Sequence, residues 1–153
     1  MRNFKRLLAI VLVILNILAM AACSKRIKKI SGEEFALRLR DHSFVVNQSD
    51  TSADGLLSSY VAYPEENSKS VTVTYSEFES EDDARMCFNT TKHSFERAKH
   101  AGDYTEITIG NQKFTAKNGT DYIAIVIFAE NTLIMASGTS EVQVKDAIKY
   151  LGY

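Results

Sequence analysis

Two segments of the chain begin with a capping signal and continue with apolar residues at helical spacing. Ser31 and Glu34 form a capping box, in which the serine side chain caps the helix and the glutamate lies three residues further on. Ser140 and Gln143 repeat the arrangement ahead of a second apolar stripe near the C-terminus. The sequence predicts a short helix from Ser31 to near His42, and a last helix that docks its apolar side on the domain.

The clearest helical pattern follows Ser80. Three acidic residues come directly after this serine, where they suit the positive end of a helix dipole. Small and apolar residues then recur on one face of the predicted helix: Ala84, Cys87, Phe88, Thr91, Phe95 and Ala98. This face should pack on the core.

Between these helices the apolar period changes from 3.6 to two, which indicates strands. Residues 71–76 alternate apolar and polar, and residues 122–128 are apolar on both faces, so the latter should form a covered central strand. Two shorter candidate strands cover residues 44–46 and 60–63. After the second helix, four strands are expected at residues 104–109, 112–116, 120–128 and 132–136.

These elements predict an α+β domain over residues 31–153. We expect a single antiparallel β-sheet of about five to seven strands packed by helices, in the order α-β-β-α-β-β-β-β-α. This order resembles that of α/β/α sandwiches such as PsbP-like and Mog1-like domains. The resemblance implies a fold, and fold alone does not transfer function.

The first 22 residues have the layout of a signal peptide. Residues 1–6 include three basic residues and no acid, and residues 7–20 are apolar apart from Asn16. This apolar run of about 14 residues is shorter than the roughly 20 that span a bilayer. The sequence therefore predicts a cleaved leader over residues 1–22.

The leader ends in MAAC at positions 20–23, which resembles the lipobox of bacterial lipoproteins. Met20 stands where leucine is commoner. The resemblance implies cleavage after Ala22 and a thioether-linked diacylglycerol on Cys23, usually with an added N-acyl chain. Ordinary cleavage after the A-x-A site formed by residues 19–21 is the alternative, and it would release a soluble domain. The succession of lipobox, polar domain and a C-terminal Leu-Gly-Tyr at positions 151–153 resembles small, uncharacterised lipoproteins of Gram-positive bacteria of the clostridial kind.

Charge is distributed unevenly along the chain. The net charge is −1, but the leader holds Arg2, Lys5 and Arg6 and no acid, so the mature chain has 15 Lys and Arg against 19 acids, near −4. This balance does not favour nucleic-acid binding. The four cations of residues 23–30 predict a short basic tether, which either is attracted to anionic lipids or is a solvated, extended linker.

No catalytic residue, metal ligand or cofactor site is predicted. Cys87 lies on an apolar helical face, where a thiol is packed and inert. His93 and His100 are seven residues apart, which is not metal-ligand spacing, and His42 suits a helix end. No P-loop, G-x-S-x-G or H-E-x-x-H motif is present.

Tyr60 and Tyr63 form the candidate binding patch, since they flank polar loops. The sequence favours a non-catalytic binding or accessory module, lipid-anchored on the extracytoplasmic face of the cell membrane, with a protein or small-molecule partner. Two alternatives stay open: an envelope hydrolase with scattered site residues, and a structural subunit of a membrane complex.

Overall fold

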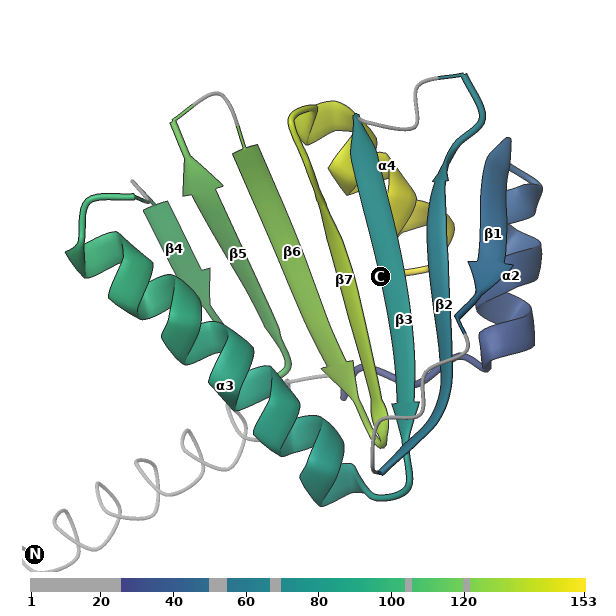
Figure 1. The fold of residues 1–153 in the computed structure, drawn as a ribbon, viewed down its shortest axis with the longest axis horizontal. Helices are drawn as coiled ribbons and strands as arrows, with labels where there is room; N and C mark the ends of the chain where they lie inside the picture. Colours follow the sequence, from purple (N-terminus) through teal and green to yellow (C-terminus); the bar gives the residue numbers. More distant parts are fainter. Residues whose placement is uncertain (1–25, 50–54, 67–69, 104–105, 120–121) are drawn as a thin grey trace, which may run out of the picture.

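The protein folds around one antiparallel sheet with helices on both faces (Figure 1). The structure, a computed structural model, describes residues 26–49, 55–66, 70–103, 106–119 and 122–153. Within these ranges the sheet has seven strands in the order β1-β2-β3-β7-β6-β5-β4. The predicted fold class, α+β with a single antiparallel sheet of five to seven strands, is confirmed.

Along the described chain, the first helix is followed by three strands, a long helix, four strands and a last helix. Their bounds are α2 (Gly32–Arg40), β1 (Phe44–Gln48), β2 (Leu56–Pro64), β3 (Val71–Phe78), α3 (Glu81–His100), β4 (Glu106–Ile109), β5 (Lys113–Asn118), β6 (Tyr122–Ala129), β7 (Thr132–Gly138) and α4 (Glu141–Tyr150). The predicted order had two strands before the long helix. The structure has three strands there, because both short candidate strands form and pair with each other.

The predicted serine caps begin all three described helices. The side chains of Ser31, Ser80 and Ser140 accept hydrogen bonds from the backbone N–H three residues further on. Each bond satisfies one of the N–H groups that a helix start leaves without a partner. The first helix ends at Arg40, two residues before the predicted end.

Two apolar cores lie on opposite faces of the sheet. Helices α2 and α4 cover one face, where Phe35, Leu39 and Tyr75 are completely buried. Helix α3 covers the other face and buries Ala84 and Phe88 against β6. As expected, β6 is buried on both faces, since it lies between the two layers.

The antiparallel topology gives the sheet two distinct ends. At one end lie the β6–β7 turn, the end of β3 and the loop before β5, and the segment before α2 runs behind the lower ends of these strands in Figure 1. At the opposite end, β1 begins and β2 ends, with Phe44 paired to Pro64. We call the first the strap end and the second the cleft end, for the features described next.

Candidate functional site

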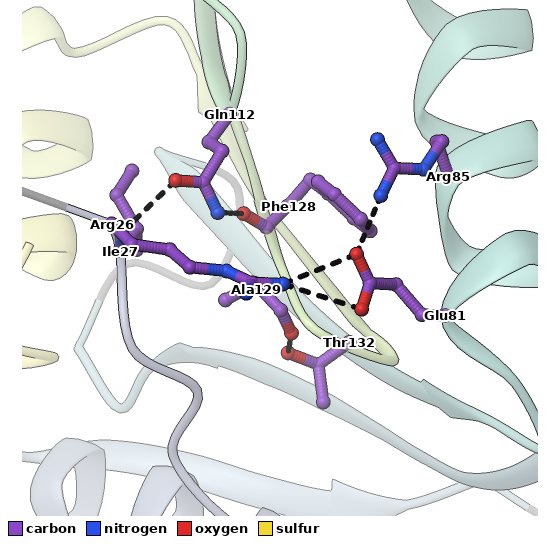
Figure 2. Close-up of polar contacts among 8 residues, drawn as sticks. All are labelled: Arg26, Ile27, Glu81, Arg85, Gln112, Phe128, Ala129 and Thr132. Atoms are coloured by element: carbon purple, nitrogen blue, oxygen red, sulfur yellow. Dashed lines mark hydrogen bonds and ion pairs between the residues drawn. The ribbon is translucent and has the colours of Figure 1, made fainter. Parts of the chain in front are cut away.

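Residues 26–30, here called the strap, lie docked against the domain. The N–H of Ile27 donates to Oε1 of Gln112 at 3.0 Å, and Nε2 of Gln112 donates to the carbonyl of Phe128 at 3.3 Å (Figure 2). Gln112 therefore links the strap backbone to the end of β6. Ile30, the last strap residue, is 7% exposed and belongs to the core under α2.

A charged group joins the start of the strap to α3. Arg26 donates from Nη2 to both carboxylate oxygens of Glu81, at 3.2 and 3.3 Å. Glu81 also forms an ion pair with Arg85, whose Nη2 lies 2.5 Å from Oε1 of the glutamate. The Arg85 guanidinium lies 5.2 Å from the centre of the Phe128 ring (Figure 2). The Arg26 side chain is 67% exposed, so its pair adds about 0–1 kcal/mol to the free energy of unfolding. It orients the strap more than it stabilises the fold.

The Lys29 side chain makes the better-shielded contact. Its Nζ donates to Oε1 of Glu77 at 2.8 Å and to Oδ1 of Asn131 at 2.7 Å. Asn131 in turn donates to the carbonyl of Phe78 at 2.6 Å, so the lysine joins the strap to the β6–β7 turn and to β3. The hydrogen bond from Lys29 holds the pKa of the Glu77 carboxyl below its usual value. The carboxylate is thus charged whenever the strap is docked at neutral pH.

Two tyrosines bind the strap carbonyls from the α2–α4 side. Tyr75 donates its hydroxyl to the carbonyl of Ile30 at 3.2 Å, and Tyr153 donates to the carbonyl of Lys28 at 2.9 Å. Burial raises the pKa of both hydroxyls, that of Tyr153 to about 12. Both therefore remain protonated donors over the physiological range.

Of the two interpretations of the basic tether, these contacts do not fit the solvated, extended linker. A solvated, self-repelling tether would leave its cations in water, whereas Arg26 and Lys29 pair with acids of the domain and the strap backbone is hydrogen-bonded at three residues. The part of the chain that contacts the domain therefore includes residues from Arg26 onward, five residues before the predicted start. Cys23 and the leader lie outside the described residues.

We expect Glu77→Gln to loosen the strap without unfolding the domain. The variant removes the charge that Lys29 faces, and a hydrogen bond between charged groups is worth about 1.5–3 kcal/mol when partly shielded, so strap opening should rise roughly tenfold or more. Hydrogen–deuterium exchange of the peptide containing residues 26–30 measures this opening. Glu79→Gln is the matched control, since Glu79 is an exposed acid near the same strand end, and it should leave exchange unchanged.

The same contact predicts a pH dependence. Because the pKa of Glu77 is lowered in the folded chain, the pair stabilises the strap above the ordinary carboxyl pKa of 4.5 and loses this effect as the pH falls through the lowered value. The exchange ratio between the Glu77→Gln variant and the unmodified chain should approach one in acid. A ratio independent of pH would show that Glu77 does not hold the strap by its charge.

The two tyrosines of the candidate patch do not form one surface. Tyr60 and Tyr63 are three residues apart on β2, so their side chains point to opposite faces of the sheet. Tyr60 packs against Phe35 and Tyr75, with ring centres 6.3 and 5.9 Å apart, and covers the start of α2 at Gly32. Tyr63 accepts a hydrogen bond from Asn47 at 3.2 Å on the other face. Tyr60 is thus partly buried and packs against the core under α2.

Cys87 and the histidines take surface or edge positions. Cys87 is half-buried at the edge of the α3 contact, less covered than expected, and burial raises the pKa of its thiol. His93 pairs with Glu96 at 2.8 Å on the exposed side of α3. Among the described residues, no three His, Cys, Asp or Glu side chains are grouped so that they could hold a metal ion.

A cleft that the sequence did not reveal lies at the cleft end. It has a volume of about 390 Å³ and is lined by the start of β1, the end of β2 and one side of α4. His42 stacks on Tyr150, with ring centres 3.7 Å apart and planes inclined by 10°, and Asp146 lies on the same helix. Only the fold brings these residues together, since they come from segments about 100 positions apart.

Comparison with known proteins assigns no family. No protein-family model matches the chain, and none of the curated proteins matches it significantly. Among the described residues, none of the helices has the length and apolar character needed to cross a membrane. The functional interpretation therefore depends on the residues themselves.

Proposed function

We propose that this protein is an extracytoplasmic lipoprotein, anchored in the cell membrane through acyl chains on Cys23. The observation that carries the proposal is the position of the strap. The chain already contacts the domain at Arg26, only three residues after the cysteine of the lipobox-like MAAC, and residues 26–30 are held there by hydrogen bonds and ion pairs. A chain that leaves a membrane anchor and enters the domain directly suits a protein held at the membrane surface.

We further propose a non-catalytic binding or accessory role for the domain. Among the described residues, three groups with shifted pKa values, Glu77, Tyr75 and Tyr153, lie at the strap contacts, and the other two, Cys87 and Glu141, lie on α3 and at the start of α4. Shifted groups that converge on a pocket would favour an enzyme, whereas the first three serve the attachment of the strap. The His42 cleft, at the opposite end of the sheet, is the candidate place for a partner or small ligand.

Extraction of membranes from the native host tests the anchor. Two or three acyl chains contribute about 0.8 kcal/mol for each buried CH₂ group, which holds a protein durably, whereas ionic attraction is screened by salt. We expect the protein to stay with membranes in concentrated salt and at alkaline pH, and to be released by a non-ionic detergent. Release by salt alone would contradict lipid anchoring.

A further inference from the structure

The chain leaves little free length between the predicted anchor and the folded domain. Ser24 and Lys25 are the only residues between Cys23 and Arg26, and three extended residue steps span at most about 11 Å. Lipid on Cys23 would therefore hold Arg26 within about 11 Å of the anchored residue, whatever conformation these residues adopt.

The strap transmits this constraint to the whole domain. Its first residue is joined to α3 through Glu81, its second to the loop before β5 through Gln112, and its fourth to the β6–β7 turn through Asn131. These contacts are spread along the strap end of the sheet rather than at one point. A domain attached in this way cannot turn freely about its anchor as it could on a flexible linker.

A groove beside the strap carries an excess of positive charge. It has a volume of about 840 Å³ and is bounded by the strap, the start of β5, part of α2 and the C-terminal residues. Five of its lining residues are basic and one, Glu34, is acidic. Arg38 neutralises Glu34 by pairing with it at 2.5 Å, whereas Lys28 and Lys113 form no ion pair with any described residue. The groove thus presents two ammonium groups, close to the predicted anchor, that have no ion-pair partner among the described residues.

We infer that the strap end of the domain lies against the bilayer and that the groove beside it contacts anionic phospholipid headgroups through Lys28 and Lys113. The inference rests on the proposed anchoring at Cys23. An ammonium group this close to a lipid anchor lies near the phosphates of the surrounding lipids. Cations at a membrane surface are attracted to these phosphates. The mature chain is acidic overall, so an anionic membrane repels most of its surface. The positively charged groove is therefore the side of the domain that should face the membrane.

This orientation directs the other end of the molecule away from the membrane. The cleft formed by His42 and Tyr150 lies at the end of the sheet opposite the strap, because β1 begins and β2 ends there. A partner that binds the cleft would approach from the aqueous side of the envelope, without crossing the headgroup layer.

The absence of tryptophan in the sequence allows a direct test. Asn111→Trp places one fluorophore at the strap end, next to Gln112, and Asn118→Trp places another at the far end of β5. Both asparagines are exposed, and the two positions are about 20 Å apart along an extended strand. The chain from Cys23 onward, which retains every described contact, carries Cys87→Ser so that Cys23 is its only thiol.

Each single-tryptophan chain is coupled through Cys23 to a maleimide phospholipid in vesicles that contain dansyl lipid and phosphatidylglycerol. We expect energy transfer to the dansyl headgroups to be about twofold or more higher from position 111 than from position 118, because transfer falls steeply with distance across the roughly 20 Å between them. Equal transfer from the two positions would overturn the orientation. Chemical coupling supplies the anchor here, so this outcome is independent of whether the native host acylates Cys23.

The headgroup contact is tested in the same chains with Lys28→Gln and Lys113→Gln combined. These changes should lower the difference between the two positions on vesicles with phosphatidylglycerol, and concentrated salt should do the same. On vesicles of phosphatidylcholine alone, the two lysine changes should have no effect. A difference that is insensitive to the lysines on anionic vesicles would overturn the contact with headgroups.

Discussion

Cys23→Ser should abolish formation of the mature protein in the native host. A serine hydroxyl is far less nucleophilic than the cysteine sulfur that takes up diacylglycerol. In the bacterial lipoproteins whose lipobox the MAAC resembles, acylation of the cysteine precedes removal of the leader. We expect an uncleaved precursor that is longer by the 22 leader residues, and incorporation of a labelled fatty acid that falls to background. Electrophoretic mobility and the fatty-acid label measure the two effects.

Cys87→Ser is the matched control for this experiment. It removes the other cysteine of the chain, which is half-buried on α3 and has its pKa raised by burial. Processing and fatty-acid incorporation should both be those of the unmodified protein. Normal processing of the Cys23→Ser chain, with a mature product of unchanged size, would contradict the lipoprotein assignment.

Phe35→Ala should cause the largest loss of stability among single truncations on the α2 side. Phe35 is completely buried, its ring centre lies 5.3 Å from that of Tyr75, and Tyr75 also binds the strap at Ile30. Truncation of a buried phenylalanine costs about 3–5 kcal/mol through lost transfer energy and the cavity left behind. Urea denaturation should show a lower midpoint with an unchanged slope.

Leu37→Ala provides the comparison on the same helix. The Leu37 side chain is 60% exposed, so its removal should change the free energy of unfolding by no more than about 0.5 kcal/mol. A comparable loss in both variants would mean that α2 does not bury the face described here. If Phe35→Ala lowers the free energy of unfolding by much less than about 3 kcal/mol, the neighbouring side chains must close the cavity that the truncation leaves.

The parts of the fold that the sequence predicted are those governed by local chemistry. Serine caps act on a backbone N–H three residues away, so Ser31, Ser80 and Ser140 could be read directly from the chain. The central position of β6 followed from its apolar character on both faces. Periodicity alone predicted β1 and β2 less completely, because both are partly exposed and the predicted segments 44–46 and 60–63 are shorter than the strands of five and nine residues that form.

The strap could not be predicted, because its contacts join residues far apart in the sequence. Lys29 reaches Glu77 and Asn131, which are 48 and 102 positions away, and the Tyr153 hydroxyl reaches a carbonyl 125 positions away. A run of lysine and arginine has the composition of a solvated linker, and nothing local marks the acids that neutralise it. For Tyr60 and Tyr63 the spacing itself is informative, since residues three apart lie on opposite faces of a strand and do not form one surface.

The intact mass of the mature protein, purified in detergent from its native host, tests the central proposal most directly. We expect a chain that begins at Cys23 and carries the additional mass of a diacylglycerol, with or without an N-linked acyl chain, and fragmentation should place this mass on residue 23. An unmodified chain that begins at Ala22, as ordinary signal-peptide cleavage would produce, would contradict the proposal and define a soluble secreted domain.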